Sequence, residues 1–225
     1  MRLVTYYTDT HAEMARQYVI SRAWNFTDIR ATHYQQTCPT GHFKSQGWDR
    51  CMLDKLDCLM RLPCDHEPTL YVDSDVVLMP GLAEWCEQQT REMLFDEIRY
   101  SDDVVQWCAG VMLFRCTTKV REWWRLVADL SPVWELPDQD VIHQLRVQSR
   151  ERNGVLPLLM SVLPSQRVCN WATIGNRSVW HGEPFDVPAE CLAWHANWTL
   201  GVASKLEMLR RVAVGETSHG SPIQA

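Results

Sequence analysis

The sequence lacks the features that mark membrane, secreted and zinc-ribbon proteins. No stretch approaches the about 20 consecutive apolar residues that a membrane span needs, and residues 1–10 hold no apolar run long enough for a signal peptide. None of the 9 cysteines forms a Cys-x-x-Cys pair, so their spacing suggests neither a disulfide framework nor a zinc ribbon. These absences predict a cytoplasmic protein with reduced thiols, of the soluble microbial or viral kind.

Positive charge is also scarce. The chain carries 22 Lys and Arg residues against 28 Asp and Glu residues, which gives a formal net charge of -6. A surface that binds duplex phosphates without regard to sequence is normally basic. The composition therefore disfavours that class of function, and a local basic groove stays open as an alternative.

The rest of the composition is that of an ordinary globular protein. Apolar residues make up 46% of the chain and charged residues 22%, which excludes disorder, collagen and coiled coil. A length of 225 residues favours a single domain. We expect one folded domain over residues 1–214 and a flexible tail over residues 215–225.

Strand and helix patterns alternate along the chain. The expected strands cover residues 3–7, 27–32, 69–79, 110–115 and 155–163, and the expected helices cover residues 11–24, 47–62, 82–93, 119–130 and 138–148. This alternation predicts an α/β fold in which helices flank a mostly parallel central sheet.

Two acids interrupt the clearest of these strands. Asp73 and Asp75 stand between the apolar runs 70–72 and 76–79. Side chains two apart on a strand point the same way, and two carboxylates on one face repel each other unless a positive charge lies between them. A Mg²⁺ or Mn²⁺ ion resolves that repulsion. The alternative is a solvated turn that carries two acids, and the apolar flanks favour the metal site.

A second group of candidate site residues lies among tryptophans toward the end of the chain. It contains His195, Asn197, Gly201 and Lys205. Glycine permits close backbone approach to a ligand, and lysine supplies a point charge for phosphate. A lone histidine is usually structural, but here its nitrogen would favour Mn²⁺ over Mg²⁺.

Two further segments carry candidate site residues. Gln139 and Asp140 stand at the start of an expected helix, where acids often serve only as caps. Gly110 opens a buried strand that follows Cys108.

Taken in order, these segments resemble the GT-A glycosyltransferases, near the nucleotide-diphospho-sugar transferases and the glycogenin-like and galactosyltransferase relatives. The resemblance spans about residues 3–209. The matching pieces are Tyr6–Asp9, Lys55, the YVDSDVVLM strand with its Asp-x-Asp, then CAGVMLFR, DQDVIHQL and HANWTLG with Lys205. It implies a GT-A, Rossmann-like fold for the single domain.

The resemblance also implies a role for each matched residue. Asp73, Asp75 and His195 would hold a manganese ion that bridges the donor diphosphate. Gln139 and Asp140 would lie near the sugar and the acceptor as catalytic residues. The residues implied to bind the donor are Tyr7, Thr8, Asp9, Lys55, Asp73, Ser74, Gly110, Asn197, Gly201 and Lys205.

The activity that the resemblance implies is metal-dependent transfer of a sugar from a nucleotide diphosphate, UDP by preference, to an acceptor hydroxyl, with retention of configuration. The acceptor stays open between a saccharide, a small molecule, a protein and a hydroxylated DNA base. One departure is Cys108, because relatives commonly carry Asn at that place. Cysteine is the poorer hydrogen-bond partner.

Two other functions compete with this one. A haloacid dehalogenase-type phosphatase also carries an Asp-x-Asp after an apolar strand, which Asp73 and Asp75 fit, but that motif normally follows the first strand and leaves His195 unexplained. A non-catalytic sugar-binding module could use some of the 11 Trp residues as stacking platforms. Binding of a nucleotide diphosphate separates the transferase from both alternatives.

Overall fold

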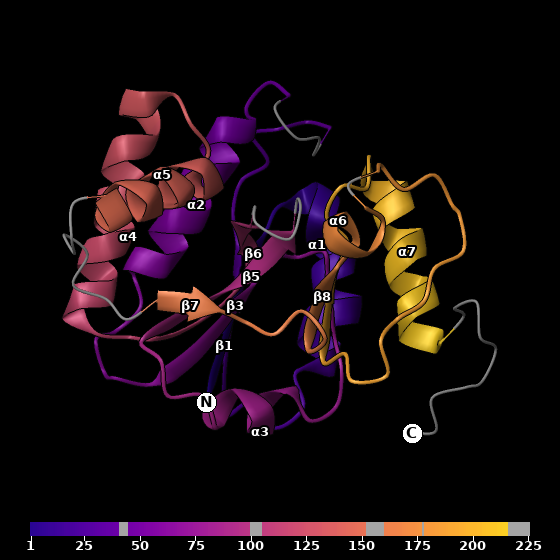
Figure 1. Ribbon diagram of the computed structural model, residues 1–225. Coiled ribbons are helices and arrows are strands. Elements are labelled where there is room, and N and C mark those ends of the chain that lie inside the picture. The colour runs from indigo at the N-terminus through magenta and orange to yellow at the C-terminus, as the bar shows by residue number, and fades with distance from the viewer. Residues whose placement is uncertain (41–44, 100–104, 152–159, 177, 216–225) are drawn as a thin grey trace.

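Two β-sheets organise the fold of the computed structural model, which describes residues 1–40, 45–99, 105–151, 160–176 and 178–215 (Figure 1). The central sheet has six strands in the order β2-β1-β3-β6-β5-β7, and a smaller sheet has three in the order β4-β9-β8. The strands of the central sheet are β1 (Arg2–Tyr7), β2 (Asp28–His33), β3 (Pro68–Val72), β5 (Met93–Arg99), β6 (Val105–Arg115) and β7 (Met160–Val162). Those of the smaller sheet are β4 (Val76–Leu78), β8 (Val168–Asn170) and β9 (Ala193–His195).

The pairing confirms the predicted mostly parallel central sheet. β1 is parallel to both β2 and β3, and β7 is parallel to β5. β6 is the antiparallel member, paired with β3 on one side and with β5 on the other. In the smaller sheet β9 is antiparallel to β4 and parallel to β8.

Helices cover both faces of the sheets. Figure 1 shows α2 (Trp48–Met60), α4 (Thr118–Trp134) and α5 (Asp138–Glu151) gathered on one side, and α1 (Ala12–Met14) and α7 (Val202–Val214) on the other. The short helices α3 (Leu82–Glu87) and α6 (Trp171–Ile174) complete the described set. No helix among the described residues is long and apolar enough to cross a membrane.

Alternation along β1 and β3 explains why these strands are apolar throughout. Val4 and Tyr71 pack into the core beneath α2, α4 and α5. Leu3, Leu70 and Val72 pack into a second core on the opposite face. Because both faces of the sheet are buried, each strand needs apolar side chains at successive positions.

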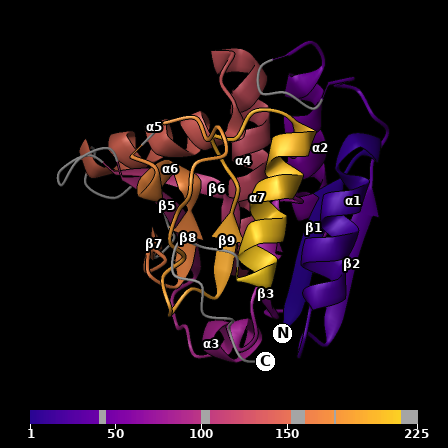
Figure 2. The same ribbon diagram turned by 90° about the vertical axis from the view of Figure 1, so that its right-hand side faces the viewer.

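A third core lies between the smaller sheet and the helices on its side. Met14 and Tyr18 pack there with Met208 and Leu209 of α7, and Trp194 of β9 is fully buried among them. Figure 2 shows α1 and α7 on the same side of the molecule. This packing fixes α7, and hence its N-terminus, relative to β9.

The expectation of one strand over residues 69–79 is wrong. β3 ends at Val72, residues 73–75 form a turn, and β4 joins the smaller sheet. The reason is pairing: Val72 is the last residue of β3 opposite β6, whereas Val76 lies opposite His195 of β9. Asp73 and Asp75 are therefore brought together by a turn and not by the alternation of a strand.

Other expected elements differ in their bounds. Residues 11–24 form a run of short 3-10, α and π turns that ends at Arg22, and not one α-helix. The helix expected over 82–93 ends at Glu87, and β5 follows it as an unexpected strand. The strand expected from residue 110 begins at Val105, and the strand expected over 155–163 is β7 in its described part. Residues 155–159 and the tail residues 216–225 lie outside the described residues.

Candidate active site

The ends of several strands and helices enclose a cavity of about 540 Å³. Its wall is built from the end of β1, the turn after β3, the middle of β6, the starts of α5 and α7, and the end of β9. The predicted site residues that line it are Tyr7, Thr8, Lys55, Asp73, Ser74, Asp75, Gly110, Gln139, Asp140, His195, Asn197, Gly201 and Lys205. The fold thus brings together residues that are far apart in the sequence.

Asp9 lies outside this lining. Its carboxylate is exposed and pairs with His33, with Nε2 at 2.8 Å. His33 lies on β2, and its ring lies against that of Tyr7 at a centroid distance of 5.4 Å. Asp9 is therefore not on the cavity wall, although its partner His33 contacts the lining residue Tyr7.

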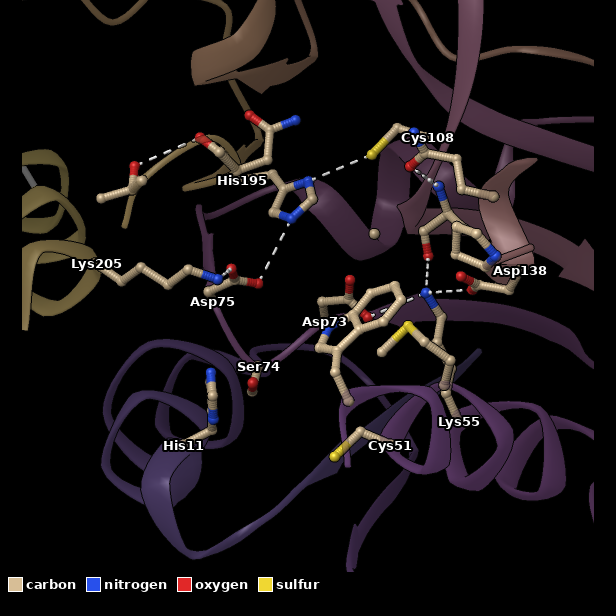
Figure 3. Close-up of a pocket in the computed structure, with 18 of the residues that line it drawn as sticks. His11, Cys51, Lys55, Asp73, Ser74, Asp75, Cys108, Asp138, His195 and Lys205 are labelled. Carbon is tan, nitrogen blue, oxygen red and sulfur yellow. Dashed lines mark hydrogen bonds and ion pairs between the residues drawn. The ribbon is translucent and has the colours of Figure 1, made fainter. Parts of the chain in front are cut away.

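Lys55 of α2 is a buried cation at the floor of the cavity (Figure 3). Its Nζ lies 3.0 Å from Asp138 Oδ2 and 3.3 Å from Asp73 Oδ1, and it donates to the carbonyl oxygen of Ala109 at 2.7 Å. Burial alone would lower the pKa of Lys55, but the charges of Asp138 and Asp73 outweigh burial and raise that pKa above its usual range. Lys55 therefore holds two carboxylates from different elements in place.

Asp75 is the buried acid of the turn. Lys205 of α7 donates to its Oδ2 at 2.5 Å, and Nε2 of His195 lies 3.5 Å from its Oδ1. Burial would raise the pKa of Asp75, but the positive charges of Lys205 and His195 hold that pKa well below its usual range. Asp75 is thus an ionised carboxylate at neutral pH.

Asp73, Asp75 and His195 form a donor set that fits a divalent cation. One ligand atom from each of the three lies within 4.8 Å of the others. Two carboxylate oxygens and one imidazole nitrogen suit Mn²⁺ or Mg²⁺. Asp73 is also oriented from behind, because the Tyr71 hydroxyl donates to its Oδ1 at 2.5 Å.

His195 is held between two walls of the site. A Cβ atom built on Gly110 would lie 2.1 Å from Cε1 of His195, so the ring lies directly against the backbone of β6. The Nδ1 atom of the ring faces Cys108 Sγ at 3.6 Å and Asp96 Oδ2 at 3.7 Å. Burial would lower the pKa of His195, but Cys108 and Asp75 raise it well above its usual range. A cation that binds the ring displaces its proton.

The start of α5 forms another part of the wall. Gln139 accepts a hydrogen bond from the backbone N–H of Ala109 at 3.4 Å, and Gln106 donates to Asp140 Oδ1 at 2.8 Å. Both side chains are therefore fixed against β6 at the cavity.

The N-terminus of α7 points at the cavity. Gly201 precedes the helix with a φ of 79°, a region that favours glycine, and it lines the cavity together with Lys205. Asn197 accepts from the backbone N–H of Ala172 at 2.8 Å. Its buried amide nitrogen has no hydrogen-bond partner among the described residues. A helix N-terminus, an ammonium group and a spare N–H donor together suit an anion.

Sequence reasoning missed part of the site. Asp96 of β5 is fully buried, and its carboxylate accepts from the Asn170 amide at 2.9 Å and from the Glu97 N–H at 2.7 Å. The sequence feature that could have identified Asp96 is an acid within a largely apolar run, MLFDEIR, as at Asp73. It was missed because the expected helix ended at Met93 and residues 94–99 were assigned to no element. The cavity is also lined by His11, Trp48, Cys51 and Met52, which no motif marked.

Comparison with known proteins bears on the fold. No protein-family model and no curated protein sequence matches the chain. A glycosyltransferase involved in the glycosylation of the major capsid of PBCV-1 has a similar structure, with a TM-score of 0.61 and 13% identity over 93% of this chain and 98% of that one. The galactosyltransferase LgtC in complex with donor and acceptor sugar analogs gives a TM-score of 0.53 and 15% identity over 98% of both chains.

A third similar structure comes from mouse. Xyloside xylosyltransferase 1 in its apo form gives a TM-score of 0.51 and 11% identity, and the match covers 87% of this chain and 97% of that one. At such identities the likeness bears on the fold alone. The six-stranded sheet and these neighbours confirm that the chain has a GT-A glycosyltransferase-like fold.

Proposed function

We propose that the protein is a metal-dependent glycosyltransferase that moves a sugar from a nucleotide diphosphate to an acceptor hydroxyl. The observation that carries this proposal is the convergence of Asp73, Asp75 and His195 with Lys205 at the N-terminus of α7, all on one cavity. A cation site beside an anion site is what a metal–diphosphate complex requires. One of the similar structures, LgtC, contains donor and acceptor sugar analogs.

Asp73, Asp75 and His195 would hold the ion, with Mn²⁺ preferred over Mg²⁺ because of the imidazole donor. When bound, a divalent cation there supplies Lewis-acid stabilisation of the departing diphosphate. Lys55 holds one of these ligands in position, because its Nζ lies 3.3 Å from Asp73 Oδ1.

The chain's own donors complete the anion site. Lys205, the backbone at Gly201 and the unpartnered amide of Asn197 would contact the diphosphate. Together they would stabilise the charge that develops on the leaving group. Because Lys205 pairs with Asp75 at 2.5 Å, the bound diphosphate would compete with Asp75 for the lysine.

The remaining wall would bind the nucleoside and the sugar. Tyr7, Thr8 and Ser74 lie at the end of the cavity formed by β1 and the turn, where a uridine would sit. Gln139 and Asp140 lie on the α5 side, and we assign to them the contacts with the sugar and the acceptor. Transfer with retention, a UDP donor and a cytoplasmic location stay predictions.

Two alternatives are less well supported. In a haloacid dehalogenase-type phosphatase the Asp-x-Asp follows the first strand, whereas Asp73 follows β3. That chemistry also gives no role to His195, which lies 3.5 Å from Asp75. A non-catalytic sugar-binding module gives no role to a buried cation and anion pair on one cavity.

The test is equilibrium binding of UDP with and without Mn²⁺, measured by calorimetry. We expect UDP to bind only when Mn²⁺ is present, and the Asp75→Asn variant to lose that binding. Asp129→Asn is the matched control, because Asp129 is exposed on α4 and does not line the cavity. The proposal would be contradicted if UDP bound equally tightly with and without Mn²⁺, or if Asp75→Asn kept the Mn²⁺-dependent binding of UDP. Phosphate release from a phosphomonoester would favour the phosphatase.

A further inference from the structure

We propose that Asp96, Cys108 and His195 form a second metal site, which selects a soft divalent cation such as Zn²⁺. This group of three buried residues is separate from the Asp73–Asp75 pair but shares the imidazole ring with it. His195 faces Asp75 through Nε2 and faces Cys108 and Asp96 through Nδ1. Figure 3 shows one ring nitrogen toward Cys108 and the other toward Asp75.

The spacing of the ligand atoms fits a tetrahedral ion. Cys108 Sγ lies 3.6 Å from His195 Nδ1, and Asp96 Oδ2 lies 3.7 Å from the same nitrogen. Zinc bonds of about 2.0 to 2.3 Å at tetrahedral angles place such ligand atoms roughly 3.5 Å apart. Small side-chain movements therefore suffice to bring all three atoms onto one ion.

The donor types separate the two sites. A thiolate, an imidazole and a carboxylate are the usual ligands of zinc, and thiolates favour soft metals. The Asp73, Asp75 and His195 set has no sulfur and favours a harder ion. Cys108 is thus the residue that makes the second site selective.

The carboxylate of this site is already oriented. The Asn170 amide nitrogen lies 2.9 and 3.1 Å from the two oxygens of Asp96, and the Glu97 N–H donates to Oδ1 at 2.7 Å. Hydrogen bonds of this kind hold metal ligands in position. They leave Oδ2 facing His195.

The site can be reached from the cavity. Cys108 and His195 both line it, although Asp96 is fully buried behind them. An ion can enter from the cavity side, and a water molecule from the cavity can supply a fourth ligand, as in open zinc sites. The Cys108 thiol gives up its proton to the solvent when the ion binds.

Titration with Cd²⁺, followed by ultraviolet absorption, tests the proposal. A thiolate bound to Cd²⁺ gives a charge-transfer band, and we expect one such site whose band disappears in Cys108→Ser. In Asp96→Asn we expect affinity to fall at least about tenfold. The control Cys64→Ser, at a half-buried cysteine outside the cavity, should keep the band.

The inference does not depend on glycosyl transfer, and the two can fail separately. Asp75→Asn should keep the Cd²⁺ band while it loses Mn²⁺-dependent UDP binding. Thermal melting of each variant without metal shows whether it is folded. No band in the wild-type protein, or an unchanged band in Cys108→Ser, would overturn the second site and leave the proposed function standing.

Discussion

The contact between Gly110 and His195 decides which side chain position 110 accepts. The ring lies where a Cβ atom would be, at 2.1 Å from Cε1. Contacts this short must be relieved by movement, and in a buried site the movement falls on the ring or on the strand. The position therefore controls the orientation of a proposed metal ligand without touching the ion.

The variant Gly110→Ala tests this control. We expect the ring to move away from Asp75, Mn²⁺ affinity to fall at least about tenfold, and stability to fall by about 1 to 3 kcal/mol. Calorimetric titration with Mn²⁺ and thermal melting measure the two effects. Gly182→Ala is the matched control. Alanine is disfavoured there by the φ of 102°, but a Cβ atom at this position meets nothing within 4 Å. That control should lose stability and keep its Mn²⁺ affinity, and an unchanged affinity in Gly110→Ala would contradict the prediction.

Residues of the site could be predicted from sequence where a charge interrupts an apolar run. Asp73 and Asp75 were found in this way, and His195 and Lys205 were found from the tryptophans and the glycine near them in the sequence. Asp96 carries the same signal, but residues 94–99 were assigned to no strand, so the pairing of β5 with β6 was not predicted. No sequence feature shows that Cys108 faces His195, because that contact depends on how two sheets meet.

At the scale of elements, the site depends on how α7 meets the turn between β3 and β4. The ion pair of Lys205 and Asp75 joins them at 2.5 Å. The apolar runs on either side of the turn resemble one strand in the sequence, yet they pair with β6 and with β9. An apolar run indicates that a strand is buried but not which strand it pairs with, so the division of this segment into β3 and β4 could not be predicted.

This ion pair should make stability depend on pH. The pKa of Asp75 is held well below its usual range in the folded protein, and in the unfolded chain it is about 3.9. The stabilisation is therefore fully present above about pH 4 and is lost as pH falls through the folded pKa.

We expect the difference in unfolding free energy between the wild type and Asp75→Asn to shrink when pH is lowered from neutral to about 3. Urea unfolding in the presence of a chelator measures it. The exposed control Asp129→Asn should show little difference at either pH. A difference for Asp75→Asn that grows toward low pH would contradict the assignment.

At the scale of the whole molecule, Lys55 connects segments that are far apart in the chain. From α2 it reaches the turn at Asp73, the carbonyl of Ala109 on β6 and Asp138 at the start of α5. The α/β class and the order of most elements could be predicted from alternating periodicity. This connection could not, because it needs the packing of α2 and α5 on one face of the sheet.

Removal of this cation should weaken the entire fold. Lys55→Met leaves the buried Asp138 carboxylate without its counter-charge, and we expect the free energy of unfolding to fall by about 3 kcal/mol. Urea unfolding measures it, with Lys119→Met on the exposed face of α4 as the control. Equal free energies of unfolding for the two variants would show that Lys55 does not stabilise the fold.

The turn at residues 73–75 also limits how the chain can change in length. β3 is held in register by β6, and β4 is held in register by β9, so neither strand can slide to absorb a deletion or an insertion. A slip of one residue would turn every side chain of a strand to the opposite face. The geometry of two sheets therefore fixes the three-residue length of this loop, independently of the metal chemistry proposed for it. Length variation in this chain is therefore expected in other loops, while substitutions within the turn leave the length of this loop unchanged.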